Sequence, residues 1–415
     1  MWLALLSGGC GRFGFQERHG AGGTGGPITA VVTSDETAAG PAGQPIRGAT
    51  VLIERDGTIE RTATDDAGTV QFSSTGVTVY HIVYRTGQNW RIYTVAASLA
   101  DVVELGGRAA STLDRQMMLS VPAAGGQNRL TATMPDQCGV LGDYGTSSWQ
   151  FTYSAACEGK AVRMLVFRLD AGARTSGYID AGMVTLARGS SHTVSGTYAA
   201  ISTPTVQITN LPAGATSAAA TFVARVGVDL TRLSHEIGTA FPQGGSATVT
   251  TTAAAGGNAI MITAAGPFSQ YSASSQRVVP IVGGSPIAVD AAQMLPLYGA
   301  LTVTHLPMLS WNGVDDSGTL VAVQASSFGV EWDAYLERSA ATVTLPAFPP
   351  DLPIAIPSVF DRVIVTKLGI PGADAATLAR TIDRSWQAWP SHPDLLPDEG
   401  SSMTRMMYDS GLGPP

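Results

Sequence analysis

Short apolar runs alternate with polar residues along most of the chain, and turn-forming residues separate them. In the first hundred residues, β-branched and aromatic side chains recur at the density of strands, and Arg55–Thr58 and Asp66–Gly68 have the composition of tight turns. Short strands at this spacing are typical of a β-sandwich. The expected strands here are Thr50–Glu54, Thr69–Phe72, Val77–Tyr84 and Arg91–Val95.

The same pattern continues for most of the remaining chain. We therefore predict an all-β fold of tandem antiparallel β-sandwiches, Ig-like or transthyretin-like, with little helix. We expect one sandwich over residues 27–121, one large or two small sandwiches over 122–297, and another over 298–390. The later expected strands are Trp149–Tyr153, Val162–Leu169, Thr205–Thr209, Ala220–Val226, Ser246–Thr251, Ala259–Thr263, Leu301–Thr304, Thr319–Gln324, Val330–Tyr335, Ala341–Leu345 and Arg362–Thr366.

The end of the chain has a different pattern. Between Asp374 and Trp389, apolar residues recur at helical spacing, which fits one amphipathic helix capped by Asp374 or a terminal strand with a bend. Residues 391–415, rich in Pro, Ser, Gly and Met, are predicted to be loose.

A faint repeat links the second and third regions. Val206–Ala213 followed by Phe222–Gly227 is similar to Val343–Ala347 followed by Val363–Gly369. Either a duplication of the sandwiches or chance similarity in a chain of biased composition would produce this repeat.

Composition restricts the function. Charged residues form only 13% of the 415 residues and the net charge is −8, so the chain lacks the concentrated basic face that nucleic-acid binding needs. No run approaches the roughly 20 apolar residues of a membrane-spanning helix.

The first residues are similar to the end of a bacterial lipoprotein signal peptide. Met1–Leu6 is apolar, small residues follow, and then comes Cys10, which the resemblance implies is lipidated and becomes the mature N-terminus. The match has no basic start, a short apolar core, and Ser7 where that family prefers Leu. A frayed N-terminus carrying a chance cysteine is the alternative. We interpret residues 1–10 as a signal-like segment and 11–26 as a Gly-rich tether.

Three cysteines are present: Cys10, Cys138 and Cys157. If Cys138 and Cys157 pair, their loop constrains the unfolded chain by roughly 3 kcal/mol, and Cys10 remains as the odd thiol for an anchor. Two buried reduced cysteines in a cytosolic protein are the alternative. No Cys-x-x-Cys or His-x-x-x-His spacing indicates a metal site.

Two motifs carry a family resemblance. Gly43-Gln-Pro-Ile-Arg-Gly-Ala-Thr-Val51 and Thr64-Asp-Asp-Ala-Gly-Thr-Val-Gln-Phe72 are similar to the two hallmarks of the carboxypeptidase regulatory-like domain. The resemblance covers about 90 of the 415 residues and implies a seven-stranded, transthyretin-like sandwich. It implies an accessory or surface module, and it does not imply peptidase activity.

The motifs also have a direct physical interpretation. Asp65 can cap its own turn, Gly68 can adopt a positive φ, and Phe72 can fill the core.

Little in the sequence indicates chemistry. Six scattered histidines lack a second ligand at metal spacing, and no nucleophile elbow or phosphate loop is present. Asn312, Asp315 and Asp316, on a Gly-rich turn, are a weak candidate Ca²⁺ site, for which a polar hairpin turn is the simpler interpretation. Trp311 and Trp332 are weak candidates for sugar stacking, and core packing is the favoured interpretation because Trp332 alternates with Val330 on one face of an expected strand.

We therefore expect a non-enzymatic, extracytoplasmic protein without cofactors. It would be anchored to the outer membrane or cell surface through lipid on Cys10 and serve a structural, adhesive or partner-docking role. The partner, a protein or a glycan, is unknown. A glycan-binding accessory module using exposed Trp residues is the alternative, and an enzyme with an unrecognised site remains open.

Overall fold

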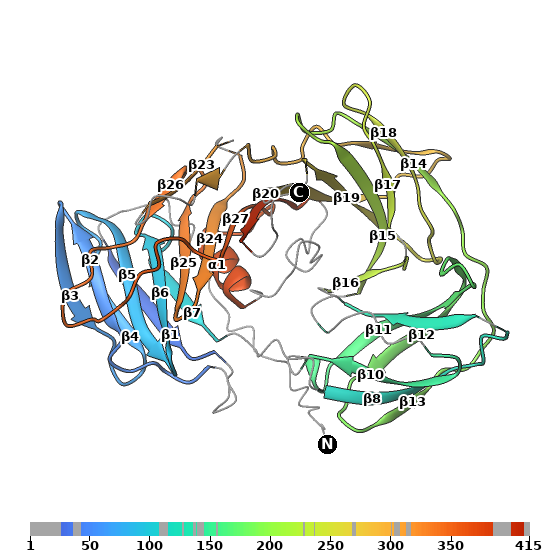
Figure 1. Ribbon diagram of the computed structural model, residues 1–415, viewed down its shortest axis with the longest axis horizontal. Helices are drawn as coiled ribbons and strands as arrows, with labels where there is room; N and C mark the ends of the chain where they lie inside the picture. The colour runs from blue at the N-terminus through green and yellow to red at the C-terminus, as the bar shows by residue number, and fades with distance from the viewer. Residues whose placement is uncertain are drawn as a thin grey trace, which may run out of the picture.

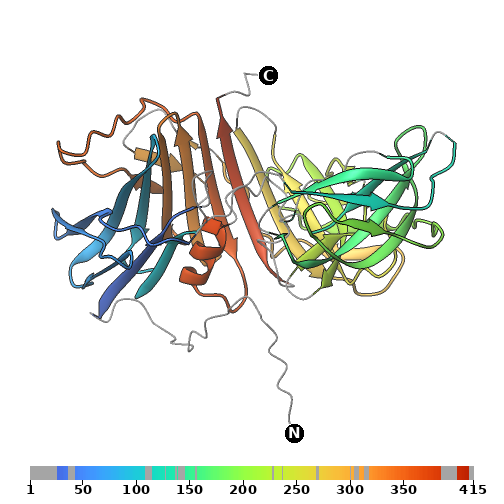
Figure 2. The same ribbon diagram turned by 90° about the horizontal axis from the view of Figure 1, so that it is seen from below.

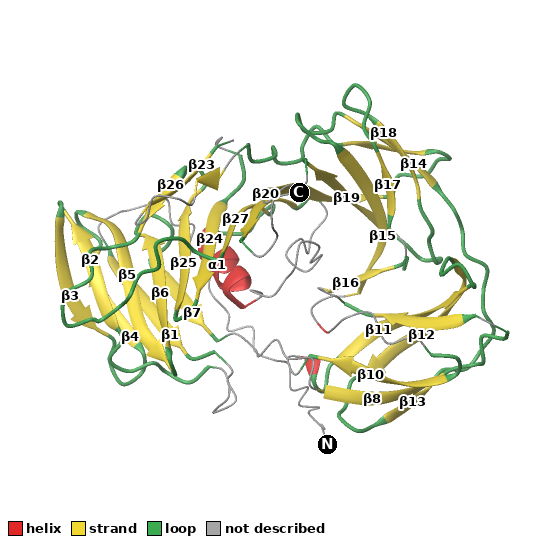
Figure 3. Cartoon of the chain, viewed as in Figure 1, coloured by secondary structure: helices red, strands yellow, loops and turns green. Residues whose placement is uncertain are grey.

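The computed structural model describes residues 26–35, 43–107, 115–126, 128–135, 138, 145–154, 157–226, 229–235, 237–267, 271–299, 301–302, 308–312, 317–384 and 400–410. Within them the chain forms 28 strands and one short helix, which confirms the all-β expectation (Figure 3). The described helix is too short to cross a membrane. The strands build four β-sandwiches that follow one another around an arc (Figure 1).

Sandwich 1 is a seven-stranded unit whose two layers enclose one apolar core. The layers have the strand orders β4-β1-β7 and β3-β2-β5-β6. Buried residues such as Ile28, Val51 and Tyr80 meet between the layers because alternate residues of each strand face inward. The strands are β1 (Pro27–Thr33), β2 (Thr50–Arg55), β3 (Thr58–Ala63), β4 (Thr69–Ser73), β5 (Val77–Thr86), β6 (Asn89–Ala96) and β7 (Val102–Gly106).

The turn before β4 confirms the roles predicted for Asp65 and Gly68, whereas Phe72 is only partly buried and packs against the core of sandwich 1. One carboxylate oxygen of Asp65 accepts hydrogen bonds from the backbone N–H groups of Ala67 at 2.9 Å and Thr69 at 2.8 Å. Gly68 has φ +71°, and a Cβ there would lie 2.4 Å from the carbonyl oxygen of Val32. Only glycine satisfies both the backbone angle and this close approach.

Sandwich 2 begins earlier than expected. Its first strand, β8, pairs with β10 and β13 and therefore belongs to the second unit, although the sequence analysis placed residues 115–120 in the first. Its layers are β10-β8-β13 and β9-β11-β12. The strands are β8 (Arg115–Ser120), β9 (Arg129–Thr133), β10 (Ser148–Tyr153), β11 (Ala161–Leu169), β12 (Thr175–Thr185) and β13 (Ser191–Thr193).

Strand β11 joins the cores of sandwiches 2 and 3. Met164 and Val166 are buried inside sandwich 2, whereas Leu165 and Phe167, on the opposite face, pack with the core of sandwich 3. Because both faces of β11 are buried, its central residues form a continuous apolar run, and polar and apolar residues do not alternate there.

Sandwich 3 resolves the middle region into two small sandwiches. Its layers are β18-β14-β21 and β16-β15-β19-β20, with β17 beside β15. The strands are β14 (Thr205–Thr209), β15 (Ser217–Val226), β16 (Asp229–Arg232), β17 (Gly238–Ala240), β18 (Ala247–Thr250), β19 (Ala259–Ala265), β20 (Tyr271–Pro280) and β21 (Ile287–Asp290).

Sandwich 4 includes a strand from the tail that was predicted to be loose. That expectation was wrong for Ser402–Asp409, because β28 lies between β20 and β27 with most of its residues buried. The layers are β22-β23-β26 and β25-β24-β27-β28. The strands are β22 (Leu301–Thr302), β23 (Met308–Trp311), β24 (Leu320–Ser327), β25 (Val330–Glu337), β26 (Thr342–Thr344), β27 (Arg362–Gly369) and β28 (Ser402–Asp409).

The helix is α1 (Ala375–Arg384). Asp374 caps it by accepting hydrogen bonds from the backbone N–H of Thr377 at 2.8 Å and from its hydroxyl at 2.9 Å. This confirms a helix with the predicted cap. Residues 385–399, which include the predicted continuation to Trp389, lie outside the described residues.

The sandwiches repeat one topology. We call the seven strands of sandwich 1, β1 to β7, positions A to G in chain order. In these letters its two layers have the strand orders D-A-G and C-B-E-F. Sandwich 3 reproduces both orders, and sandwich 2 does so without a described strand at C. Sandwich 4 has β25-β24-β27-β28 at C-B-E-F, and β22 takes the place of G. This repeat supports duplication. The faint sequence repeat does not follow this structural repeat, since it matches the strands at positions A and B of sandwich 3 with those at positions D and E of sandwich 4.

Three C-B-E-F layers join edge to edge into one long sheet (Figure 2). The F strands of sandwiches 3 and 4, β20 and β28, pair antiparallel. The C strand of sandwich 4, β25, pairs in parallel with the F strand of sandwich 1, β6. The first and last sandwiches of the chain are therefore neighbours, and we call the β25–β6 pairing the seam.

Candidate functional site

The cysteines lie partly within the described residues. Cys138 and Cys157 form a disulfide buried in the core of sandwich 2, in agreement with the pairing that the sequence allowed. Cys10, the predicted lipidation site, lies outside the described residues.

The candidate calcium loop is only partly described. Asp315 and Asp316 lie outside the described residues, and Asn312 is exposed, with its carbonyl accepting a hydrogen bond from the backbone N–H of Gly299 at 3.3 Å. Within the described part of the chain, no group of three His, Cys, Asp or Glu side chains is placed to hold a metal ion. The calcium interpretation stays a prediction.

The two tryptophans that were weak candidates for sugar stacking are core residues, which confirms the core-packing interpretation and excludes stacking on either ring. Trp311 is 3% exposed and Trp332 is 1% exposed, which leaves neither ring a face for a ligand. The indole N–H of Trp311 donates to the carbonyl oxygen of Ala340 at 3.0 Å. Trp332 packs with Phe360, their ring centroids 5.9 Å apart. Both rings are positioned by the core of sandwich 4.

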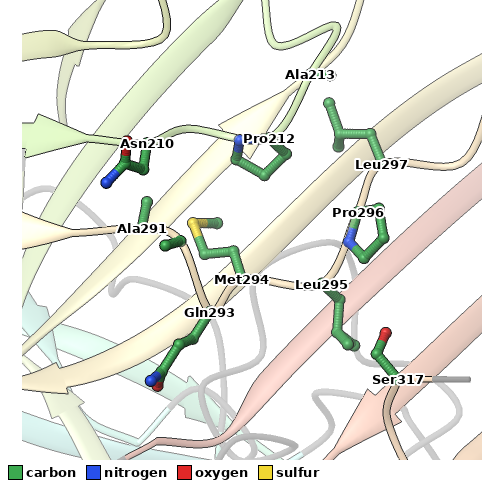
Figure 4. Close-up of a pocket in the computed structure, with 11 residues that line it drawn as sticks. Asn210, Pro212, Ala213, Ala291, Gln293, Met294, Leu295, Pro296, Leu297 and Ser317 are labelled. Atoms are coloured by element: carbon green, nitrogen blue, oxygen red, sulfur yellow. The ribbon is translucent and has the colours of Figure 1, made fainter. Parts of the chain in front are cut away.

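A pocket of about 470 Å³ lies where sandwich 3 passes into sandwich 4 (Figure 4). Its wall is mostly apolar and includes Met294 and Pro296. The polar groups are already engaged, since the Asn210 amide donates to Asp290 at 2.9 Å and Arg277 donates to the carbonyl oxygen of Gln293 at 2.6 Å. The pocket therefore lacks the convergent free polar groups that orient a small ligand.

The seam contains a buried ion cluster on one face of the sheet. Arg91 of β6, with its side chain 4% exposed, forms an ion pair with the fully buried Asp333 of β25 at 2.8 Å and a second with Glu331. Burial raises the pKa of the Glu331 carboxyl, Arg91 opposes that shift, and the nearby Asp333 adds to it. Two carboxylates in an apolar strand are stable here because one guanidinium reaches both.

The opposite face of the same strands carries a polar relay. Nδ1 of His81 lies 2.9 Å from the hydroxyl of Thr94, which accepts the indole N–H of Trp332 across the seam at 2.9 Å. Nε2 of His81 lies 3.1 Å from a carboxylate oxygen of Glu54. The hydrogen bond from His81 lowers the pKa of Glu54. The Nε2–H of His81 can therefore donate to Glu54, while the hydroxyl of Thr94 links the imidazole to Trp332.

Two exposed features lie beyond the seam. Strand β3 ends the long sheet and all six of its residues are exposed. The turn between β24 and β25 carries Phe328, which is 96% exposed, and its Gly329 carbonyl accepts the backbone N–H of Trp90 at 2.8 Å. The tip thus lies beside the β5–β6 turn.

Neither the seam nor the free edge of β3 was predicted from the sequence. The signal for the seam was present, since Glu331 and Asp333 interrupt an apolar strand and such carboxylates require a buried cation. Their partner, Arg91, is 240 residues distant in sequence, and nothing local identifies it.

Comparisons with known proteins add no identification. No protein-family model matches the sequence, and no curated protein sequence matches it. The Bacillus anthracis TIE protein is 11% identical, with 64% of this chain and 49% of that chain covered and a TM-score of 0.14. This chain thus spans about half the length of that protein. A Ca²⁺-stabilized adhesin that helps an Antarctic bacterium reach out and bind ice is 12% identical, with 85% and 96% covered and a TM-score of 0.13. Likenesses this weak carry no argument about function.

Proposed function

We propose that the protein is an exported, surface-anchored, non-enzymatic docking protein. Its repeated sandwiches form a scaffold whose exposed edges and tips contact a partner, and its anchor is lipid attached to Cys10. The N-terminal sandwich is a carboxypeptidase regulatory-like module in this proposal, on the strength of its two motifs.

The observation that carries export is the disulfide in sandwich 2. Cys138 is fully buried and Cys157 is 1% exposed, so their bond is part of the core of that unit. Disulfides of this kind persist in oxidising compartments and are rare in the reducing cytosol.

The direction of the chain supports an anchor at the N-terminal end. Gly26, whose carbonyl accepts the backbone N–H of Ser74 at 3.2 Å, lies at the end of sandwich 1 where β5 begins. The Phe328 tip lies beside Trp90, at the end where β5 has finished and β6 begins. A tether that enters at Gly26 therefore joins sandwich 1 at the end opposite the Phe328 tip.

Mass spectrometry of the protein from fractionated cells tests this proposal. We expect the chain in the membrane fraction, with a diacylated Cys10 as its N-terminus and, in a non-reducing digest, a peptide that joins Cys138 to Cys157.

The matched control is Cys10→Ser. It should move the protein into the soluble extracytoplasmic fraction without changing the disulfide. Recovery of the wild-type chain in the cytoplasm with both thiols free would overturn the proposal.

A further inference from the structure

The outer edge of β3 has free backbone groups. Asp56 and Gly57, with φ 48° and 78°, form a two-residue turn that makes Arg55 and Thr58 the first hydrogen-bonded pair of the β2–β3 hairpin. Because bonding alternates along an antiparallel pair, the N–H and C=O groups of Ile59, Arg61 and Ala63 point away from β2. No strand of the described residues pairs with this edge.

The equivalent edge in sandwich 4 is occupied. β25 follows a two-residue turn in the same way, so Glu331, Asp333 and Tyr335 correspond to Ile59, Arg61 and Ala63. That edge binds β6 as a parallel strand, and Arg91 of β6 forms ion pairs with Glu331 and Asp333. In sandwich 4, the outer edge of the strand at position C therefore already pairs with a strand from another sandwich of the same chain.

The charge at the free edge is inverted. Arg61 stands where β25 has Asp333, so a strand added here would need an acidic residue where β6 has Arg91. In the structure Asp351, from the segment between β26 and β27, supplies that charge at 2.7 Å. The two side chains are 43% and 62% exposed, so this ion pair contributes little and exchanges readily for another carboxylate.

A second copy of β3 is a poor antiparallel partner. In an antiparallel pair of identical strands, the outward groups face one another only when a residue lies opposite itself. The two registers that pair the most of β3 place Glu60 against Glu60 or Arg61 against Arg61. Like charges directly opposite destabilise a sheet, so the strand disfavours antiparallel self-association.

We propose that β3 docks an extended segment of a different protein, which adds a parallel strand to the long sheet and places a carboxylate against Arg61. Main-chain hydrogen bonds to Ile59, Arg61 and Ala63 hold the segment, and the ion pair selects it. This inference rests on the proposed docking role and names the chemistry of the partner.

Two synthetic peptides test it. The first has the sequence of β6, Asn89–Ala96, with Arg91→Glu, and the second has the unaltered sequence. With the full chain and labelled peptides, fluorescence anisotropy should show the Glu peptide binding about tenfold tighter than the Arg peptide. Arg61→Glu should reverse the preference, since it exchanges the charge and leaves the backbone groups in place.

Arg61→Pro is the second variant. It removes an outward N–H at an edge position that donates nothing to β2, so the fold should survive while binding of both peptides is lost. An unchanged thermal midpoint verifies the fold. Absence of saturable binding to the wild type, equal binding by Arg61→Pro, or dimerisation of the chain through β3 in sedimentation would each overturn the inference. None of these results affects the membrane fractionation, so the two proposals fail separately.

Discussion

Strands β25 and β3 occupy the same position in the repeated unit but differ in burial and in whether their outer edge is paired. β25 is buried along most of its length and continues the sheet into sandwich 1, whereas β3 is exposed at every residue and ends the sheet. Their topologies are the same, so the difference lies in their side chains. β25 combines large apolar residues with carboxylates that match Arg91, and β3 carries Thr, Glu and Arg, which suit solvent.

The ion pairs of the two strands differ in the same way. Arg91 and Asp333 are both buried in the seam, whereas Arg61 and Asp351 meet at the surface. Breaking a buried ion pair lowers the stability strongly, because the remaining charge is left without either a partner or water. Breaking a surface ion pair changes the stability little, because water and salt screen both charges. The comparison predicts unequal responses to equivalent substitutions.

The largest effect should come from Arg91→Ala. It leaves Asp333 and Glu331 without their guanidinium, and we expect a loss of about 3 to 5 kcal/mol in the free energy of unfolding, measured with chemical denaturant. Arg61→Ala is the matched control and should cost less than about 1 kcal/mol. Equal losses for the two variants would contradict the difference between the edges.

Much of the fold could be predicted from the sequence because its signals are local. Alternation placed the strands, Asp65 and Gly68 marked a turn, and Asp374 marked the start of α1. The boundary at residue 121 was wrong because β8 pairs with β10 and β13 instead of with sandwich 1, and pairing is a long-range property.

The strand in the tail was missed for a similar physical reason. Ser402–Asp409 has few strand-forming residues, and only the edges of β20 and β27 on either side order it as β28. The core position of Trp332 could be predicted, because it alternates with Val330 on one strand face, whereas its contacts with Thr94 and Phe360 depend on long-range packing. Composition did not predict β28.

Removal of the disulfide should have the next largest effect. Cys138→Ala with Cys157→Ala should destabilise sandwich 2 by roughly 3 kcal/mol, because the open loop regains entropy in the unfolded chain. Sandwich 2 lies outside the long sheet, so hydrogen exchange at the seam should be unchanged. Faster exchange in β25 of this variant would show that the seam depends on sandwich 2, and would weaken the comparison.

A smaller effect is expected at Trp332. Trp332→Phe removes the indole N–H that reaches Thr94 across the seam, and should cost about 1 kcal/mol in thermal or chemical unfolding. Glu60 holds the equivalent position in β3, and Glu60→Gln should stay within about 0.5 kcal/mol of the wild type. A larger loss at Glu60 than at Trp332 would reverse the assignment of the two edges.

The smallest effect is a dependence on pH at Glu54. The hydrogen bond from His81 lowers its pKa, so the ionised carboxyl stabilises the fold above its unfolded pKa, and this contribution is lost as pH falls through the folded pKa. Because Glu54 is 37% exposed, the contribution is below about 1 kcal/mol. The unfolding midpoint of the wild type should exceed that of Glu54→Gln at pH 7 and converge with it below about pH 4. A difference between the two midpoints that grows as the pH falls would contradict the interaction of Glu54 with His81.

Residue-resolved hydrogen exchange of the full chain tests the difference between the edges most directly. Amides of β25 should exchange slowly along the seam. In β3, the amides of Thr58, Glu60 and Thr62 should be protected by β2, whereas those of Ile59, Arg61 and Ala63 should exchange at nearly the rate of an unfolded chain. Protection of Ile59 and Arg61 equal to that of Glu331 and Asp333 would contradict a free edge at β3, and rapid exchange along β25 would contradict the seam.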